Sequence, residues 1–346
     1  MRKILVTGGC GYIGSHTIVD LIDHGFEVIS ADNFQNSDPS VLDSLETITG
    51  QRIQNYNVDL CDLGETRRIF LENRDIIGVV HFAALKAVGE SVEQPLLYYK
   101  NNLESLLNIL SCLEEFRIKH FIFSSSCSVY GNTTELPVTE TTPRQEAQSP
   151  YARTKQIGED ILQDFAMMHP FENFIALRYF NPSGAHESAL LGESPLNIPS
   201  NLVPVITETA IGRRYEMTIF GDDYPTRDGS CVRDFIHVMD IAHAHTRALH
   251  YVLGRLNIDN YEVFNLGTGN GVTVLEAIKA FEKVNDLTFE YRIGRRRHGD
   301  VIAIYANNDK AETKLGWHAT RTIEDIMRTA WAWEKQRSAR LQLVEA

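Results

Sequence analysis

The sequence contains little cysteine, and what it has is dispersed. Five cysteines lie scattered among 346 residues, and no two of them form a C-x-x-C pair. An odd and scattered set argues against the disulfide scaffold that is typical of small secreted domains, and it favours a reducing compartment. We therefore expect a cytoplasmic protein.

Long apolar runs are missing as well. No run approaches the roughly 20 residues that a bilayer-spanning helix needs. Met1-Arg2-Lys3 is followed by an apolar stretch that is too short for the core of a secretory signal peptide. These absences predict that the protein has no membrane partner.

Positive charge is scarce relative to negative charge. Against 46 Asp and Glu there are 33 Lys and Arg, which gives a formal net charge of −13. This field repels polyanions, so we expect no nucleic-acid partner. Metal-ligand patterns are not evident either, and we expect no metal. His243 and His245 stand two apart in a helical segment and face different ways, and His250 is too far along to complete a site.

What the sequence does have is a regular alternation of short β-branched runs with amphipathic segments. This alternation predicts an α/β fold with a doubly wound parallel sheet of the Rossmann type. The expected strands are 3–7, 27–31, 53–59, 76–82, 120–124, 174–179, 217–220 and 263–266. The expected helices are 12–23, 63–72, 98–116, 151–169, 238–253, 274–285 and 322–336.

A glycine turn joins the first expected strand to the first expected helix. Gly8, Gly11 and Gly14 form a GxxGxxG pattern. The first glycine allows a sharp turn, the second lets a pyrophosphate approach the backbone, and the third allows helix and strand to pack closely. Free N–H groups at the helix N-terminus then face the phosphates. The position between a strand and a helix favours dinucleotide binding over a plain glycine turn.

An acidic residue at the end of the second expected strand indicates which dinucleotide binds. Asp32 follows Gly14 at about the 20-residue spacing expected of a ribose-binding acid. A carboxylate in this place accepts hydrogen bonds from the ribose hydroxyls and repels a 2′-phosphate. We therefore predict NAD as the cofactor.

The composition and periodicity of the sequence change after residue 180. Residues 181–202 are rich in Pro, Ser, Asn and Gly and have weak periodicity, which is typical of a domain boundary or a substrate loop. We expect an NAD-binding domain at 1–180. A smaller C-terminal substrate-binding domain is expected at 181–346, with segments near 236–268 returning to the first domain.

A Tyr–Lys pair and a serine-rich segment supply candidate chemistry. Tyr151 and Lys155 stand at i, i+4, so a helix places both side chains on one face. A Lys cation lowers the pKa of a nearby phenol towards neutrality, and such a phenol exchanges a proton with a sugar hydroxyl while NAD takes the hydride. A YxxxK pair alone is common on surfaces. It gains weight from Ser126, in a polar run at the carboxyl end of a strand, where doubly wound sheets bind ligands.

Ordered motifs along nearly the whole chain resemble those of the extended short-chain dehydrogenase/reductase family, and within it those of the UDP-glucose 4-epimerases. The resembling segments are VTGGCGYIGSH, ADN, HFAALKAVGES, FIFSSSCSVYG, SPYARTK, LRYFNPSGAH, DGSCVRDFIHVMD, FNLGTG and RRRHGD. The resemblance implies a reaction in which Tyr151 removes the O4 proton and hydride leaves sugar C4 for NAD. The 4-keto sugar then rotates about its link to the diphosphate, and hydride returns to its other face.

The resemblance also implies site residues. Tyr151 would be the acid/base, Lys155 would bind the nicotinamide ribose and tune that Tyr, and Ser126 would hydrogen-bond the reacting O4. The implied NAD contacts are Gly8, Gly11, Tyr12, Ile13, Gly14, Asp32, Asn33, Asp59, Leu60, Phe82, Ala83, Ala84, Lys86, Asn101, Ser126, Tyr151, Lys155 and Phe180. The implied UDP-hexose contacts are Ser126, Tyr151, Asn181, Asn201, Leu202, Thr218, Phe220, Arg233, Arg297, Asp300 and Ile304.

The physical chemistry of the two substrate arginines agrees with these roles. Arg233 and Arg297 carry planar donors that fork onto phosphate oxygens. Without the family resemblance, RRRHGD would equally suit a solvated basic turn. The resemblance further implies a homodimer that forms a four-helix contact through residues 98–116 and 150–169 of each copy.

Three other functions remain open at this stage. A nucleotide-sugar 4,6-dehydratase of this family carries an Asp–Glu pair just before the Val-Tyr-Gly of the serine strand, where this chain has Cys127 and Ser128. Neither side chain supplies carboxylate chemistry, which favours epimerisation over elimination. A 4-reductase or decarboxylase fits the substrate segments less well. A non-catalytic sugar-nucleotide binding protein would be free to lose Tyr151 or Lys155, and both are present.

Three positions depart from the family pattern. Ala84 stands where Gly is usual, and Ile302 stands where Pro is usual. Ile304 takes the place of a Tyr in members restricted to UDP-glucose and UDP-galactose, and of a small residue in members that also accept N-acetylated sugars. Because Ile is smaller than Tyr, although β-branched and stiff, it favours tolerance of UDP-N-acetylglucosamine and UDP-N-acetylgalactosamine.

Overall fold

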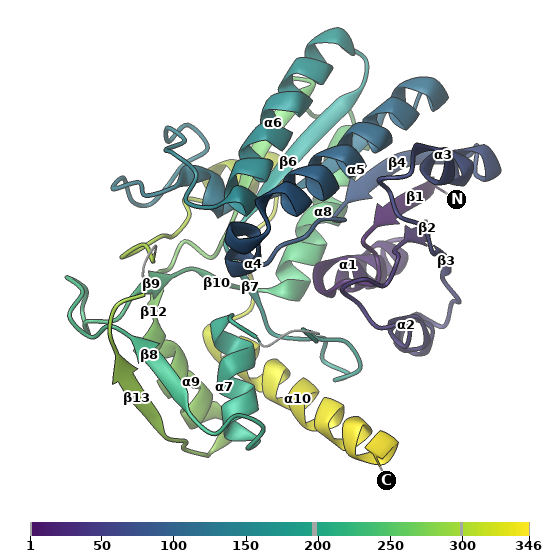
Figure 1. The fold of residues 1–346 in the computed structure, drawn as a ribbon. Coiled ribbons are helices and arrows are strands. Elements are labelled where there is room, and N and C mark those ends of the chain that lie inside the picture. Colours follow the sequence, from purple (N-terminus) through teal and green to yellow (C-terminus); the bar gives the residue numbers. More distant parts are fainter. Residues whose placement is uncertain (1, 196–198, 298–299, 346) are drawn as a thin grey trace.

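A seven-stranded parallel sheet forms the centre of the computed structural model, which describes residues 2–195, 199–297 and 300–345 (Figure 1). The strand order is β11-β6-β5-β4-β1-β2-β3, and every neighbouring pair is parallel. This confirms the predicted doubly wound fold. The strands are β1 (Arg2–Thr7), β2 (Phe26–Ala31), β3 (Gln54–Tyr56), β4 (Ile76–His81), β5 (His120–Ser126), β6 (Asn173–Tyr179) and β11 (Tyr261–Leu266).

Helices cover both faces of the sheet because successive residues of each strand point to opposite sides. In β1, Ile4 and Val6 pack into one core and Leu5 packs into the other. The first core is covered by α1 (Tyr12–Asp23), α2 (Val41–Thr49) and α8 (Val238–Leu253). The second is covered by α3 (Leu63–Glu72), α5 (Pro95–Phe116) and α6 (Pro150–Met168), with α4 (Val88–Glu93) beside α5 and α6 (Figure 1).

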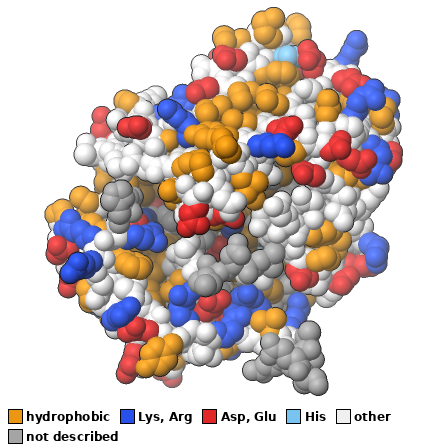
Figure 2. Space-filling view, viewed as in Figure 1, with side chains coloured by type: hydrophobic (Ala, Val, Ile, Leu, Met, Phe, Trp, Pro, Cys, Tyr) orange, Lys and Arg blue, Asp and Glu red, His pale blue; other side chains and the backbone are white. Residues whose placement is uncertain are grey.

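The C-terminal elements form a smaller body with a core of its own. The parallel pair β8 (Met217–Phe220) and β13 (Tyr291–Gly294) packs with α7 (Leu202–Ala210), α9 (Val274–Asn285) and α10 (Ile323–Glu345). Two short pairs link this body to the sheet. They are β7 (Asn181–Ser183) with β10 (Phe235–His237), and β9 (Val232–Arg233) with β12 (Val272–Thr273). Figure 2 shows a hollow in the surface between the two bodies.

Most expected elements are present, and their departures have local causes. The expected strand 53–59 shortens to β3, because the chain turns at its end, where the Val58 N–H donates to the Tyr56 carbonyl at 3.1 Å. The expected helix 322–336 extends to Glu345. Helices α2, α4 and α7 have no counterpart among the expected elements. Within the described ranges, no helix is long and apolar enough to cross a membrane.

Candidate active site

The glycine turn lies where the sheet changes its winding direction, between β1 and β4. Gly8 has φ +66°, and a Cβ there would come within 2.9 Å of the Ala83 backbone nitrogen. The backbone of Phe82 is fixed in turn by its N–H bond to the Thr7 carbonyl at 3.0 Å. Gly8 therefore supplies both a left-handed backbone and a close approach of two strand ends, which is where doubly wound folds bind nucleotides.

The other two glycines of the turn have different surroundings. A Cβ at Gly14 would come within 2.2 Å of the Gly8 carbonyl oxygen, so this position is sterically closed. A Cβ at Gly11 would meet only that same oxygen, at 3.2 Å. Gly11 is the N-cap of α1 and provides no side-chain cap. The first N–H groups of α1 are therefore left for a ligand, as a diphosphate requires.

Asp32 lies at the carboxyl end of β2, beside the glycine turn. Its carboxylate accepts hydrogen bonds from the Cys10 backbone N–H at 3.0 Å, the Phe34 N–H at 2.9 Å and the Ser37 hydroxyl at 2.8 Å. The acid is thus anchored next to the expected phosphate position. Farther out, Asn33 and Asp59 are exposed and Leu60 is buried, at the ends of β2 and β3.

The segment after β4 carries four expected cofactor contacts and is held by a residue that the sequence did not single out. Asn102 of α5 accepts from the Leu85 backbone N–H at 2.8 Å and donates to the Leu85 carbonyl at 3.0 Å and to Thr154 of α6 at 3.1 Å. Asn101 donates to the same amide oxygen at 2.9 Å. This clamp fixes Phe82, Ala83, Ala84 and Lys86 relative to α5 and α6.

The three serines that end β5 each make a different contact. The Ser124 carbonyl accepts from the Lys155 ammonium at 2.6 Å. The Ser125 hydroxyl donates to Glu159 at 2.5 Å. The Ser126 hydroxyl accepts from the Ser128 backbone N–H at 3.2 Å and caps the short 3₁₀ helix η1 (Cys127–Tyr130). The polar run therefore holds the end of β5 against α6.

Tyr151 and Lys155 share one face of α6, as the i, i+4 spacing predicts. The Lys155 Nζ lies 6.0 Å from the centre of the Tyr151 ring and 4.9 Å from that of Phe123. Tyr151 stands in the first turn of α6, which Ser149 caps by accepting from the Ala152 N–H at 3.1 Å. Tyr151 therefore belongs to the N-terminal end of α6.

Burial nevertheless governs the acid–base state of both residues in the protein alone. Burial raises the pKa of Tyr151 to about 12, and a hydrogen bond to Ser126 opposes this. Burial lowers the pKa of Lys155 to about 8, against the charge of Glu159. In the protein alone the pKa of Tyr151 is therefore raised by burial, whereas the sequence predicted that it is lowered; the Lys155 ammonium is bound to the Ser124 carbonyl instead.

A buried ion pair lies beneath this pair of residues and was missed by the sequence analysis. Glu159 pairs with Arg178 of β6 through bonds of 2.8 and 2.6 Å. The Arg178 guanidinium also donates to the Tyr130 hydroxyl at 2.8 Å, and that hydroxyl donates to Asn265 at 2.6 Å. Glu159 stands one turn beyond Lys155 on α6. This i, i+4 spacing is a signal that could have identified it.

Residues distant in the sequence converge to form the expected diphosphate cluster. The Arg297 guanidinium donates to Asp300 Oδ1 at 2.9 Å, and that of Arg233 lies 3.5 Å from the same oxygen. Arg297 also lies over the ring of Phe220, at 5.7 Å from its centre. Arg233 is held further by the Val301 carbonyl at 2.8 Å. His298 and Gly299 of the RRRHGD motif lie outside the described residues.

The remaining substrate candidates lie around this cluster. The Asn181 side-chain oxygen is buried and finds no hydrogen-bond partner in the described chain, as expected of a group that a ligand completes. Thr218 of β8 accepts from Arg292 at 3.1 Å. Asn201 stands at the N-cap position of α7, next to Leu202, and its side chain donates to Glu193 at 2.9 Å instead of capping the helix.

Glu193 connects the two groups of candidates and was also missed. Its Oε1 accepts from Asn201 and lies 3.3 Å from the Lys86 ammonium. Lys86 in turn lies 5.8 Å from the centre of the Tyr12 ring. An expected cofactor contact and an expected substrate contact therefore share one carboxylate, which no local pattern in the sequence indicates.

Ile304 lies in a small apolar cluster beside η1. It is 6 % exposed and packs in the cluster that contains Val129, Tyr130 and Phe180. Its backbone N–H bonds to the Val232 carbonyl at 3.2 Å, which places it beside Arg233. The side chain thus fills space between the end of β6 and the expected UDP site.

Cys127, which stands where a dehydratase would carry an acid, supplies no anion. Burial raises the pKa of its thiol to about 12, so it is protonated at neutral pH. The hydroxyl of Ser128 is buried beside it and lacks a partner among the residues described. No carboxylate takes the place of either side chain in η1.

Comparison with known proteins shows the family of the chain. The family model described as GDP-mannose 4,6 dehydratase matches residues 5–330. The UDP-glucose 4-epimerase of Erwinia amylovora is 46% identical over 334 residues, which cover 96% of this chain and 98% of that protein. The chain belongs to the UDP-glucose 4-epimerases of the extended short-chain dehydrogenase/reductase family.

Solved structures of that family superpose on this fold. The UDP-glucose 4-epimerase of Bifidobacterium longum, in complex with NAD+ and UDP, matches with a TM-score of 0.92 and 45% identity, covering 97% of this chain and 99% of that one. The enzyme from Stenotrophomonas maltophila, with bound NAD and formylated UDP-arabinopyranose, matches with a TM-score of 0.95 and 41% identity, covering 98% and 100%.

Proposed function

We propose that this protein is an isomerase, an NAD-dependent UDP-glucose/UDP-galactose 4-epimerase. The observation that carries the proposal is the juxtaposition of Tyr151, Lys155 and Ser126 at the end of β5, beside a glycine turn with an uncapped helix. The family relationship supports it along the full length of the chain. NAD, when bound, accepts hydride from sugar C4 and returns it to the opposite face.

The residues of the chain then have separate tasks. Gly11 leaves room for the cofactor diphosphate, and Asp32 offers its carboxylate to the adenosine ribose. Tyr151 takes the O4 proton and later returns it; burial raises its pKa to about 12 in the protein alone, and a bound cationic nicotinamide ring would lower that pKa. Lys155 holds a positive charge within reach of the phenolate, and Ser126 donates to O4.

The grip on the substrate is proposed to be firm at the diphosphate and loose at the sugar. Arg233 and Arg297 exchange their shared contact with Asp300 for phosphate oxygens, which suits two planar donors. Asn181, Asn201, Leu202, Thr218 and Phe220 hold the remainder of the UDP. A sugar that is held weakly is free to turn and present either face to the cofactor.

Epimerisation is favoured over elimination by the chemistry of η1. A 4,6-dehydratase needs acid and base groups to remove water across C5 and C6, and Cys127 is a protonated thiol at neutral pH. Neither Cys127 nor Ser128 supplies an acid for this step. Water would therefore not be eliminated from the 4-keto sugar, and the hydride would return to it.

The division of the chain is proposed to follow the two cores. Residues 1–180 carry the NAD site, and 181–346 mainly carry the UDP-sugar site. Segments near 236–268 serve the first body, since α8 packs on α1 and β11 pairs with β6. We place the protein in the cytoplasm, since its five cysteines are all free.

The partner in solution is proposed to be a second copy of this chain. Apolar side chains lie exposed on α4 and α5, where Val88, Val92, Leu96 and Leu107 are 54%, 60%, 81% and 48% exposed. Figure 2 shows apolar atoms gathered over α4, α5 and α6 on this face. A dimer that pairs α5 and α6 of both copies would cover them. A molar mass of one chain in light scattering would contradict this assembly.

Replacing Tyr151 with Phe tests the proposed function. The variant removes only the hydroxyl, and we expect kcat on UDP-galactose to fall by about 10²–10⁴-fold, the usual contribution of general acid–base catalysis. UDP affinity should remain within about twofold, because the phenol is not part of the arginine cluster. Turnover equal to that of the wild type would contradict the role of Tyr151. Release of water from the sugar by the wild type would point to a dehydratase instead.

A further inference from the structure

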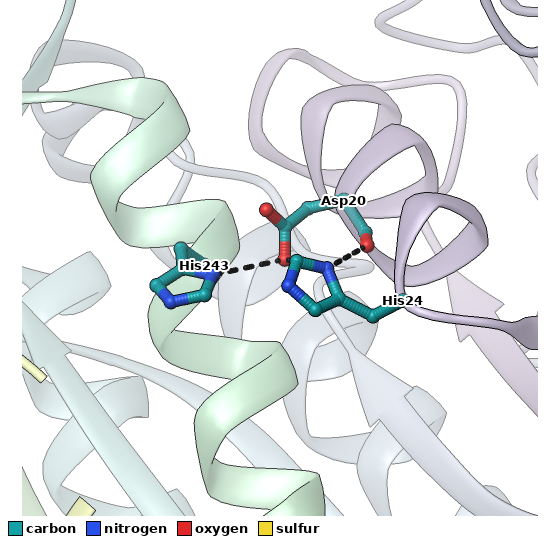
Figure 3. A group of neighbouring side chains, drawn as sticks. All are labelled: Asp20, His24 and His243. Carbon is teal, nitrogen blue, oxygen red and sulfur yellow. Dashed lines mark hydrogen bonds and ion pairs between the residues drawn. The ribbon is translucent and has the colours of Figure 1, made fainter. Parts of the chain in front are cut away.

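Three side chains with metal-binding atoms meet on the face of the sheet covered by α1 and α8. Asp20 and His24 belong to the last turn of α1 and its C-cap, and His243 belongs to α8 (Figure 3). One ligand atom from each lies within 4.8 Å of the others. The sequence analysis had considered histidine spacing along α8 alone, whereas the packing of α1 against α8 brings this group together.

The Asp20 carboxylate is the unusual member of the group. Asp20 is 8 % exposed, and its Oδ2 is buried without a hydrogen-bond partner in the described ranges. The His24 and His243 Nδ1 atoms each lie 3.4 Å from this oxygen, too far for a good hydrogen bond. The Thr246 hydroxyl, one turn along α8, is also buried with no partner in that part of the chain. Orphaned buried oxygens of this kind call for a missing cation or water.

His24 is oriented as a metal-bound histidine usually is. His24 Nδ1 lies 2.7 Å from the Asp20 backbone carbonyl. A carbonyl only accepts, so Nδ1 carries the proton and Nε2 keeps its lone pair for a ligand. A backbone carbonyl that fixes the tautomer in this way is the usual outer partner of a metal-bound histidine. Both imidazoles are partly exposed, 37% and 40%, so a cation reaches them from solvent.

The separation of one pair of candidate ligand atoms suits a small tetrahedral ion. Zinc bonds of about 2.0–2.1 Å place neighbouring tetrahedral ligands about 3.3–3.4 Å apart. The His243 Nδ1 and Asp20 Oδ2 atoms are separated by 3.4 Å. Two imidazoles and one carboxylate are donors that zinc and nickel prefer, whereas calcium and magnesium need oxygen ligands.

The charges around the group are mixed. Burial disfavours ionisation of Asp20, yet the two neighbouring imidazoles keep its pKa below the usual value. The carboxylate is therefore ionised at neutral pH. His250 lies nearby, with its ring centre 6.3 Å from that of His24, and the Arg247 guanidinium is engaged by the Leu315 carbonyl at 2.8 Å.

We propose that Asp20, His24 and His243 form a binding site for a zinc-type divalent cation, completed by water, that ties the end of α1 to α8. The site lies about ten residues along α1 from the glycine turn, which corresponds to about 15 Å. A cation there stabilises the docking of two helices and does not touch the reacting atoms. Its role is structural, and occupancy leaves the proposed chemistry unaltered.

The test uses the full-length, NAD-loaded protein after treatment with a chelator. We expect the wild type to bind one more equivalent of Zn²⁺ per chain than His24→Gln or His243→Gln, as measured by equilibrium dialysis with metal analysis. Saturating Zn²⁺ should raise Tm by about 3–5 °C in the wild type and by less than about 1 °C in either variant. Ca²⁺ and Mg²⁺ should have no such effect.

Exposed His318 provides the matched control. His318→Gln should keep the extra equivalent of zinc and the full Tm shift. Equal zinc binding by the wild type and both ligand variants would overturn the proposal, since free thiols or other histidines would then account for it. Absence of any zinc-dependent shift in the wild type would also overturn it and would leave a simple His–Asp ion pair. The Tm of each variant is also measured with chelator present. A variant that folds poorly is then recognised by a low Tm in the absence of metal.

Discussion

Individual side chains in the candidate site are set as much by burial as by their neighbours. Tyr151 and Lys155 have the spacing that their proposed chemistry needs, but burial disfavours the charged form of each side chain. It raises the pKa of Tyr151 to about 12 and lowers that of Lys155 to about 8. The ammonium is held by a carbonyl at the end of β5. In the protein alone, burial therefore favours the neutral phenol.

Ile304 provides a residue-scale test of sugar selectivity. We propose that the space it leaves, relative to Tyr, admits an N-acetyl group. Ile304→Tyr should then lower kcat/KM for UDP-N-acetylglucosamine relative to UDP-glucose by about 10–200-fold, the usual effect of small steric changes in a pocket. Steady-state assays on both substrates measure this ratio.

Ile302 is a matched control for that substitution. It lies two residues away and is 45% exposed, whereas Ile304 is 6% exposed. Ile302→Tyr should leave the ratio of the two efficiencies unchanged. A wild type with no activity on the N-acetylated sugar would refute the idea that Ile304 broadens the substrate range.

At the scale of secondary-structure elements, local patterns predicted much of the fold. The hydrophobic periodicity of the sequence predicted the observed bounds of α1, α3, α8 and α9. Each of these helices has an apolar face and a capping residue or a glycine at one end. Helix α7 was missed since its sequence follows a Pro- and Ser-rich stretch that reads as a loop. The two-residue pairing of β9 with β12 is too short to leave a periodic signal.

The unit formed by β1, the glycine turn and α1 allows packing and binding to be separated. Gly14→Ala places a Cβ 2.2 Å from the Gly8 carbonyl oxygen, so we expect loss of stability by about 2 kcal/mol or more. Gly11→Ala meets only that oxygen, at 3.2 Å, and should leave the NAD-free stability within about 1 kcal/mol. Its added methyl occupies space proposed for the diphosphate, so NAD affinity should fall at least about tenfold.

Urea unfolding of the NAD-free proteins and titration with NAD measure these two effects. If both variants lose stability equally, then Gly11 has a packing role that its open surroundings do not indicate. If Gly11→Ala binds NAD as tightly as the wild type, then the diphosphate does not approach this part of the backbone.

For the whole molecule, buried histidines couple stability to pH. Burial lowers the pKa of His16 and His245 to about 4 and that of His81 and His237 to about 3. The unfolded chain takes up protons near pH 6.5, whereas the folded chain does not. The stability that these neutral imidazoles contribute is therefore complete above pH 6.5 and is lost as the pH falls towards 4.

We accordingly expect the free energy of unfolding to fall steeply between pH 6.5 and 5, with each of these histidines contributing up to about 1.4 kcal/mol per pH unit. His245 is suited to a test because its Nδ1 donates to the Ile241 carbonyl at 2.8 Å and its Nε2 accepts from the Tyr179 hydroxyl at 2.6 Å. His245→Gln should reduce the pH dependence of the free energy of unfolding by the equivalent of about one proton, as measured by urea titrations at several pH values. His318→Gln, an exposed position, should not. A wild-type stability that is flat over this range would contradict the prediction.

The sequence by itself determined the parts of this protein that depend on local spacing. The glycine turn, the end of β2 at Asp32 and the Tyr151–Lys155 pair all lie within single strand–turn–helix units, whose periodicity fixes which side chains share a face. Only the tertiary structure decided which distant segments meet. Arg233 and Arg297 converge on Asp300, and Glu193 joins Lys86 to Asn201.

The same holds for Asp20, which meets His243 only because α1 packs on α8. Packing between helices buries apolar faces without regard to sequence distance, so the polar groups that it brings together leave no local pattern. The residues proposed for the chemistry could therefore be recognised in the sequence. The contacts among the expected substrate residues and the proposed cation site could be recognised only in the fold.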